Sequence, residues 1–305
     1  MPVPLVIAHR GACGYRPELT RGAFLLALEQ GAQAIEIDVV ASRDGELVVR
    51  HDPELSHTTD VAAHPELRDR RRLKVVRGRP RLGWFAEDLT LAELQTLTGR
   101  ERLPLLRPGS AEHDGSEAVL TLREVIDLVA AAKGIRLVIE LKHAARSGRL
   151  GLPLDELLVT TLDRAPRLPD ITIESFEHDA LDRLAEAGVQ HPLVALIGHE
   201  PLIDHLTVRH PERFAAYDGV SLGANLVRPG VVAGFREVGL EVWTWTLRPE
   251  NRFLPRRYRL PGTPFGRYAE YWQRLLDAGV TGLFADHPDL AHEVLGAPPA
   301  VGVPA

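Results

Sequence analysis

Short apolar runs alternate in this chain with segments whose apolar residues recur at helical spacing, and this alternation restricts the folds open to it. The runs begin with LVIA at residues 5–8 and end with GVTGLFAD at residues 279–286. AIEIDVV and the ELVVRHD run that returns after the Asp44–Gly45 turn read as one hairpin unit. Counted in this way, the sequence has eight strand units with helical partners. It therefore predicts an α/β fold, a closed (β/α)8 TIM barrel rather than an open sheet.

Two segments interrupt the alternation. Residues 53–115, approximately, are polar and arginine-rich, and we expect them to form an irregular insertion after the second strand. A second segment, Arg248 to Gly266, contains four prolines and predicts a loop after the seventh strand. The sequence thus predicts one barrel domain over residues 1–296, followed by a low-complexity, disordered tail at residues 297–305.

Charge and composition exclude several classes of partner. The net charge of −6 argues against broad electrostatic binding to nucleic acid or anionic membranes, although local basic stretches need separate judgement. The single cysteine, Cys13, excludes an intramolecular disulfide and a cysteine-rich metal site. No apolar run approaches the roughly 20 residues of a membrane span, and the first residues lead straight into a strand without a secretion signal. We expect a cytoplasmic protein without integral membrane association that acts on a small molecule; its oligomeric state is not predicted.

Three carboxylates stand on strands whose ends should meet at one pole of the barrel. Glu36 and Asp38 are two residues apart, so they share one strand face, and Glu140 and Lys142 repeat that spacing on a later strand. Carboxylates in a barrel interior need a cation or hydrogen bonds. An all-oxygen set of Glu36, Asp38 and Glu140 predicts one divalent cation, Mg²⁺ or Ca²⁺. Ordinary ion pairs with Lys142 and nearby arginines are the alternative.

Two histidines flank the predicted cation site. His9 and His51 follow neighbouring strands, and imidazole exchanges protons near neutral pH. A single histidine at a strand end is more often structural, but two beside a carboxylate cluster favour acid–base catalysis. Arg10 and Lys142 would supply positive charge to an anionic phosphodiester. The pattern predicts phosphodiester hydrolysis.

These motifs resemble those of the glycerophosphodiester phosphodiesterase family. The matching text is HRGACGYRPELTRGAFLLALEQGAQAIEIDVVASRDGELVVRHDPELSHTTD, then VIELK, ESF, VWTWTL and GVTGLFADHPD. The resemblance implies a (β/α)8 barrel with an insertion after the second strand. It also implies that His9 and His51 are the acid–base pair, that Glu36, Asp38 and Glu140 bind the metal, and that Arg10 and Lys142 contact phosphate.

Four further residues are singled out by the comparison with the family pattern. Leu19 stands where asparagine is usual and Ala285 where threonine is usual, and neither change removes a proton carrier or a metal ligand. Glu18 is predicted to orient Arg10 or to bind substrate. Trp243 shares a strand face with Trp245 and is predicted either to line the pocket or to pack in the core.

The expected activity is metal-dependent hydrolysis of glycerophosphodiesters, such as glycerophosphocholine or glycerophosphoethanolamine, to sn-glycerol 3-phosphate and an alcohol. One alternative is a phospholipase D-like activity on lysophospholipids or sphingolipids, which would use the same residues together with an apolar groove. Another is a non-catalytic barrel that binds a phosphoester.

Overall fold

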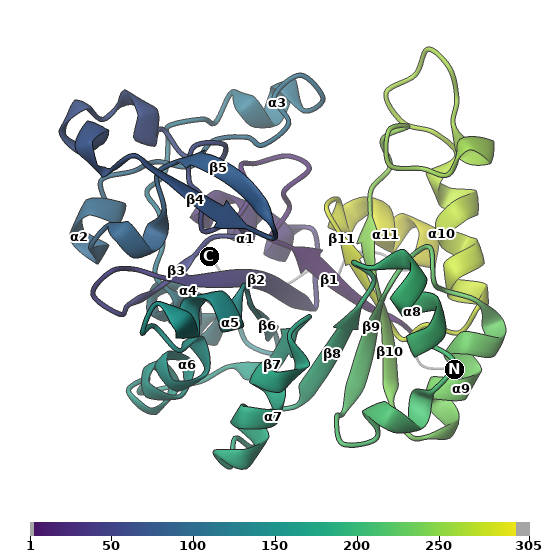
Figure 1. The fold of residues 1–305 in the computed structure, drawn as a ribbon. Coiled ribbons are helices and arrows are strands. Elements are labelled where there is room, and N and C mark those ends of the chain that lie inside the picture. Colours follow the sequence, from purple (N-terminus) through teal and green to yellow (C-terminus); the bar gives the residue numbers. More distant parts are fainter. Residues whose placement is uncertain (1–2, 297–305) are drawn as a thin grey trace.

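Eight parallel strands close into a barrel in the computed structural model, which describes residues 3–296 (Figure 1). Around the barrel their order is β1, β2, β6, β7, β8, β9, β10 and β11, and β11 pairs with β1 to close it. The barrel strands are β1 (Leu5–His9), β2 (Ala34–Ala41), β6 (Arg136–Leu141), β7 (Asp170–Ser175), β8 (Leu193–Ile197), β9 (Gly219–Gly223), β10 (Glu241–Leu247) and β11 (Gly282–Ala285). The predicted (β/α)8 barrel is confirmed, whereas the predicted tail at residues 297–305 lies outside the described residues.

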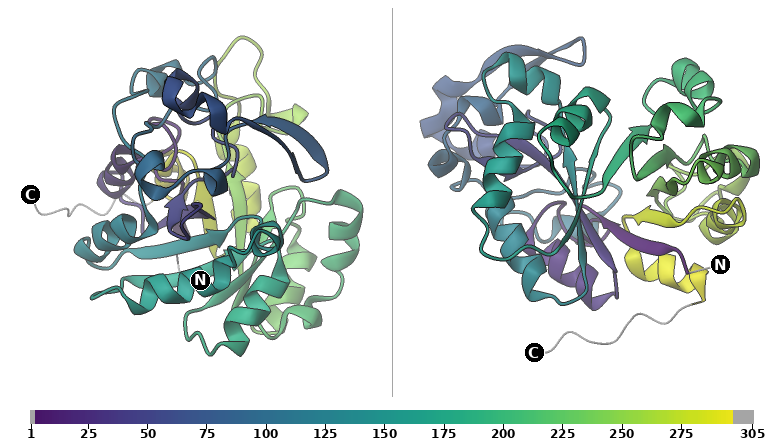
Figure 2. Two further views of the ribbon diagram at one scale, coloured as in Figure 1. Left: turned by 60° about the vertical axis from the view of Figure 1, so that its left-hand side comes forward. Right: turned by 90° about the horizontal axis from the view of Figure 1, so that it is seen from below.

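Helices cover the outside of this barrel and also occur in the connecting loops (Figure 2). None of those within residues 3–296 has the length and apolar character needed to cross a membrane. The α-helices are α1 (Arg21–Glu29), α2 (Leu91–Leu94), α3 (Pro108–Ala111), α4 (Leu122–Ala131), α5 (Ala144–Arg149), α6 (Leu154–Asp163), α7 (His178–Glu186), α8 (Pro201–Thr207), α9 (Pro229–Glu237), α10 (Tyr268–Asp277) and α11 (Pro288–Leu295).

Helix α1 shows how local sequence sets an element and its limits. The Thr20 side chain accepts a hydrogen bond from the Ala23 N–H and caps the helix, which buries Ala23 and Phe24 against the sheet. The helix begins only at Arg21, because Leu19 has a φ of 60° and cannot belong to a right-handed helix. Asparagine tolerates this left-handed conformation better than leucine, which gives a physical reason for the residue usual in the family.

The barrel interior is filled below its C-terminal pole by an apolar layer. Alternating residues of six strands meet there, and all are almost fully buried: Ile7, Ala34, Val138, Val194, Trp243 and Phe284. Their strand neighbours pack outward against the helices in a larger core. The polar side chains farther along the same strands therefore lie between this packed apolar layer and the C-terminal pole.

The hairpin unit predicted after the second strand is present. Strand β3 (Leu47–Val49) pairs antiparallel with the end of β2, with Val49 opposite Val39. Gly45 takes a φ of 83° in the intervening turn. The return brings His51 back to the C-terminal pole of the barrel.

The insertion is more regular than the sequence reading suggested. Its arginine-rich part forms a two-stranded antiparallel sheet, β4 (Arg72–Val76) and β5 (Arg79–Gly83). Arg77 and Gly78, both with positive φ, make the two-residue turn that suits such a hairpin. The expectation of an irregular segment was wrong here, because the alternation of Leu73 and Val75 with basic residues is a strand pattern hidden by its high charge.

Candidate active site

A cavity of about 280 Å³ opens at the C-terminal pole of the barrel. Six of the predicted site residues line it together: His9, Arg10, Glu36, His51, Glu140 and Lys142. Arg102, Glu174, Trp245 and Arg248 also contribute to its wall. Residues far apart in sequence converge because parallel strands present their carboxyl ends at the same pole.

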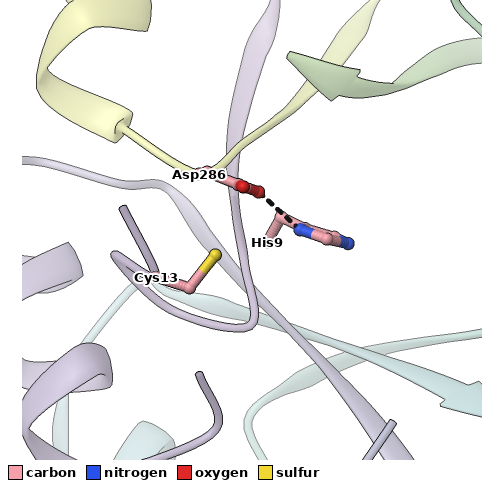
Figure 3. Close-up of side chains that lie close together, drawn as sticks. All are labelled: His9, Cys13 and Asp286. Atoms are coloured by element: carbon pink, nitrogen blue, oxygen red, sulfur yellow. Dashed lines mark hydrogen bonds and ion pairs between the residues drawn. The ribbon is translucent and has the colours of Figure 1, made fainter. Parts of the chain in front are cut away.

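His9 ends β1 and is held by a carboxylate from the opposite end of the chain. Its Nδ1 lies 2.7 Å from Oδ1 of Asp286, which immediately follows β11 (Figure 3). Burial, reinforced by Arg10, lowers the pKa of His9 to about 4, although Asp286 opposes the shift. The ring is therefore neutral at pH 7, with Nδ1–H donating to Asp286 and Nε2 free to accept a proton.

Asp286 is itself stabilised as an anion by two arginines. Arg107 Nη2 and Arg248 Nε lie 2.6 and 2.7 Å from its Oδ2. Burial would raise the pKa of Asp286, but these cations hold it well below the usual value. The Cys13 sulfur lies near His9 and Asp286 (Figure 3), yet burial raises its pKa, so the thiol stays protonated and does not favour a metal.

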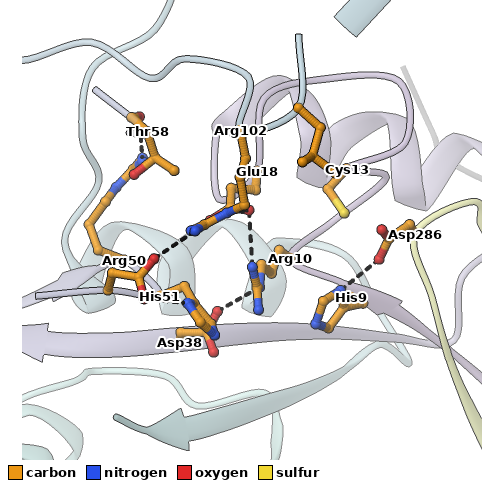
Figure 4. A network of polar contacts seen from close by, with 12 residues as sticks. His9, Arg10, Cys13, Glu18, Asp38, Arg50, His51, Thr58, Arg102 and Asp286 are labelled. Atoms are coloured by element: carbon orange, nitrogen blue, oxygen red, sulfur yellow. Dashed lines mark hydrogen bonds and ion pairs between the residues drawn. The ribbon is translucent and has the colours of Figure 1, made fainter. Parts of the chain in front are cut away.

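His51 follows β3 and has a similar support. Its Nδ1 lies 3.0 Å from Oδ1 of Asp52, and Oδ2 of Asp52 accepts a 2.6 Å hydrogen bond from Arg102. Burial, then Arg10 and Lys142, lower the pKa of His51 well below its ordinary value. Figure 4 shows His51 and His9 on either side of Arg10.

Arg10 is fixed by carboxylates on several sides (Figure 4). Its Nη1 lies 3.0 Å from Glu18, its Nε lies 2.9 Å from Asp38, and its backbone N–H donates to Glu36. Glu18 also accepts two hydrogen bonds from Arg102, which comes from the insertion. Glu18 thus contacts Arg10 directly, and its own two oxygens are both occupied by arginines.

Three buried glutamates form a cluster suited to a cation. Glu36, Glu140 and Glu174 each offer an oxygen atom within 4.8 Å of the others. Burial, followed by the neighbouring carboxylates, raises the pKa values of Glu36 and Glu174, and burial raises that of Glu140 to about 7. Glu174 Oε2 is buried and has no hydrogen-bond partner among residues 3–296. A hard divalent cation fits these residues because it would remove their repulsion and supply the missing partner.

Asp38 differs from the other predicted ligands. It is fully buried, and its two oxygens lie 3.0 Å from Lys142 Nζ and 2.9 Å from Arg10 Nε. Burial would raise the pKa of Asp38, but Lys142 and Arg10 outweigh it and hold the pKa below its usual range. Lys142 Nζ also lies 2.5 Å from Glu140, so the ammonium stands between two predicted ligands. Asp38 therefore belongs to an ion-pair network with Lys142 and Arg10, which was the alternative to metal binding considered from the sequence.

The tryptophan that lines the cavity wall is Trp245, not Trp243. Trp243 lies in the apolar layer below, and its Nε1 donates to Glu241 at the start of β10. Trp245 is two residues nearer the carboxyl end and lines the cavity. The spacing correctly predicted that Trp243 and Trp245 share a strand face. Spacing alone does not show how deep in the barrel each side chain lies.

The site residues that the sequence analysis did not predict include Asp286, Glu174, Arg102 and Arg248. Asp286 ends the GLFAD run, and Glu174 occupies in ITIES the strand-end position that Glu140 has in LVIEL, so strand-end position was a usable signal for both. Arg102 lies in a polar segment with many arginines, where nothing distinguishes it.

The fold and the site together define a barrel hydrolase in which paired histidines flank a carboxylate cluster. The sequence pattern of the Glycerophosphoryl diester phosphodiesterase family matches residues 9–290, and the chain belongs to this family.

Known proteins of this kind are similar over nearly the whole length. Glycerophosphodiester phosphodiesterase GDPD6 of Arabidopsis thaliana is 28% identical, covering 95% of this chain and 85% of the relative. Probable glycerophosphodiester phosphodiesterase 1 of Mycobacterium tuberculosis is 32% identical, covering 80% and 82%. A putative glycerophosphoryl diester phosphodiesterase from Silicibacter pomeroyi superimposes with a TM-score of 0.74 at 26% identity, covering 97% and 94%. An Oleispira antarctica phosphodiesterase, solved with the product sn-glycerol-3-phosphate, has a TM-score of 0.69 at 23% identity, covering 97% and 98%.

Proposed function

We propose that this protein hydrolyses glycerophosphodiesters such as glycerophosphocholine or glycerophosphoethanolamine to sn-glycerol 3-phosphate and the free alcohol. The observation that carries the proposal is one cavity lined by both histidines, two buried cationic side chains and the glutamate cluster. The product bound to the Oleispira antarctica phosphodiesterase supports the same product here.

The cofactor in this proposal is one divalent cation, Mg²⁺ or Ca²⁺. Glu36 and Glu140 would hold it, with Glu174 and the predicted ligand Asp38 as candidates to complete the set. When bound, such an ion stabilises negative charge on a phosphoryl oxygen and lowers the pKa of a coordinated hydroxyl.

His9 is the general base in this proposal. Asp286 fixes the tautomer in which Nδ1 carries the proton, so Nε2 can accept the proton of the attacking group. That group is either water, which gives sn-glycerol 3-phosphate directly, or a glycerol hydroxyl, which gives a cyclic phosphate that water then opens. Because the His9 pKa is about 4, the ring is ready to act as a base across the neutral range.

His51 is the general acid. Its pKa is depressed by burial and by Arg10 and Lys142. A phosphodiester anion that pairs with these two cations would oppose their effect on His51 and so favour the protonated ring that a general acid requires. The protonated ring then donates to the leaving alkoxide.

Release of glycerol 3-phosphate from glycerophosphocholine tests the proposed reaction. We expect turnover that is abolished by EDTA and restored by added Mg²⁺ or Ca²⁺, with the more effective ion identifying the cofactor. Full turnover after complete chelation would remove the cation from the proposal, and absence of product with every headgroup and ion tried would remove the activity.

A phospholipase D-like reaction is the second candidate, because the catalytic cavity adjoins a larger one. That second cavity, of about 800 Å³, shares Phe176, Leu196 and His199 with the first and adds the apolar residues Ile203 and Phe214. Its space and apolar lining suit the acyl chain of a lysophospholipid, which stays on the glycerol phosphate when the headgroup alcohol is released. A higher kcat/KM for long-chain lysophosphatidylcholine than for glycerophosphocholine would favour this candidate. A higher kcat/KM for glycerophosphocholine would favour hydrolysis of glycerophosphodiesters.

A further inference from the structure

The β4–β5 hairpin of the insertion exposes an apolar face to solvent. Leu73, Val75 and Leu82 are 70%, 63% and 57% exposed. Leu73 lies opposite Leu82, and Val75 lies opposite Pro80, so these side chains share one face of the ribbon. A clustered, exposed aliphatic face of this kind usually marks an interaction site.

The orientation of the hairpin is fixed by its other face. Lys74 Nζ lies 3.0 Å from Glu87 and 2.6 Å from Asp88, and it also lies over the Phe85 ring at 5.0 Å. The basic residue therefore points toward the body of the protein, while the leucines and the valine point away from it. This is the reverse of the pattern that packing against the protein's own core would produce.

Strong positive charge surrounds the apolar face. Residues 68–82 contain eight basic side chains and one acidic one, although the whole chain has a net charge of −6. Arg72, Arg79 and Arg81 are exposed and have no ion-pair partner within the described part of the chain. The proline-rich loop after β10 adds the exposed Arg256 and Arg257.

Both segments stand at the pole that carries the catalytic cavity. The insertion follows the β2–β3 unit and the loop follows β10, and Figure 1 shows them rising on the same side of the barrel. Figure 2 shows the hairpin extending as a two-stranded ribbon beyond the rest of the insertion. At its tip, Arg77 Nη2 lies 3.4 Å from His199 Nε2, and His199 lines the catalytic cavity.

We propose that this hairpin docks the protein on an anionic phospholipid surface, with the aliphatic side chains entering the interface and the arginines contacting lipid headgroups. Each arginine near such a surface strengthens binding by about fivefold. Lipid is favoured over nucleic acid because Leu73, Val75 and Leu82 are exposed aliphatic residues, and a phosphate backbone offers them no apolar partner. The inference does not depend on the proposed hydrolysis. The net charge of −6 does not argue against this docking, because the basic residues of the hairpin are concentrated at the pole where the barrel opens.

Vesicle flotation tests the proposal with the full chain. We expect binding to phosphatidylglycerol vesicles, weak binding to phosphatidylcholine vesicles, and a decrease at high salt. The double variants Leu73→Ser/Val75→Ser and Arg79→Gln/Arg81→Gln should each bind at least tenfold more weakly, with unchanged circular dichroism and unchanged turnover of glycerophosphocholine.

Matched controls lie at the opposite pole, before strands of the barrel. Val3→Ser/Leu168→Ser and Lys133→Gln/Arg167→Gln make the same kinds of substitution at other exposed residues and should bind like the wild type. No binding to phosphatidylglycerol vesicles, or equal losses in the controls, would overturn the proposal. Binding of a single-stranded DNA probe that is lost in the arginine variant but kept in the serine variant would overturn it too, in favour of nucleic acid.

Discussion

His9 and Asp286 are 277 residues apart in sequence and are joined by a 2.7 Å contact between Nδ1 and Oδ1. The contact links β1 to the end of β11 across the seam where the barrel closes. Closure of the fold and orientation of the proposed base therefore rest on the same pair of strands.

Asp286→Asn should lower kcat while leaving the fold intact. An asparagine can donate to His9 Nδ1 and so stabilise the tautomer that carries its proton on Nε2, where the proposed base must accept one. We expect kcat for glycerophosphocholine to fall by about 10²-fold or more. Asp289→Asn, which removes a carboxylate that instead contacts Tyr15, is the matched control. A wild-type kcat in Asp286→Asn would show that the tautomer of His9 is immaterial.

His9→Ala and His51→Ala should each lower kcat by about 10² to 10⁴-fold if the two rings act as base and acid. His292→Ala serves as a control, because that ring bonds the Gly31 carbonyl and lines neither cavity. Steady-state kinetics with glycerophosphocholine would give kcat and KM separately. Near wild-type kcat in either variant would reassign that histidine to structure.

Much of this architecture could be predicted from local sequence. Strand periodicity placed Glu36, Asp38 and Glu140 on inward faces, and strand-end positions identified His9 and His51. These inferences depend only on the direction in which a side chain points and on the pole at which a strand ends.

What could not be predicted depends on contacts across the barrel. Asp38 and Glu36 have the same local pattern, yet Asp38 pairs with Lys142 and Arg10 whereas Glu36 joins the glutamate cluster. Arg102 reaches Glu18 over 84 residues, a pairing that no periodicity encodes. The choice among chemically similar partners is made by tertiary packing.

Arg102→Gln should weaken both stability and catalysis, because Arg102 connects the insertion to two parts of the site. It donates to Glu18, which holds Arg10, and to Asp52, which holds His51. Loss of a charged hydrogen bond costs about 1.5–3 kcal/mol, so we expect a decrease of this order in the free energy of unfolding by urea, together with a lower kcat. Arg100→Gln, at a more exposed ion pair 3.5 Å from Asp114, should change neither appreciably. Equal effects of the two substitutions would contradict the role given to Arg102.

Glu174→Gln should stabilise the metal-free protein and weaken its response to metal. Removing one of three repelling carboxylates relieves the unfavourable charge in the cluster, so the Tm in EDTA rises. The same change removes a candidate ligand, so the increase in Tm on adding Mg²⁺ or Ca²⁺ becomes smaller. Glu156→Gln on the exposed side of α6 controls for the loss of charge alone. An unchanged metal response would exclude Glu174 as a ligand and leave Asp38 as the candidate.

The metal-free protein should lose stability as the pH rises through the neutral range. Glu140 has its pKa raised from 4.5 to about 7 in the folded state, chiefly by burial. A raised folded-state pKa means that its contribution to stability is fully present below about pH 4.5 and is lost as the pH rises through about 7. Between pH 5 and pH 8 we therefore expect the Tm in EDTA to fall further than the Tm in saturating Mg²⁺ or Ca²⁺, because a bound cation favours the ionised carboxylates. Glu140→Gln should flatten the EDTA curve relative to the wild type, whereas parallel curves with and without metal would show that this cluster does not bind the ion.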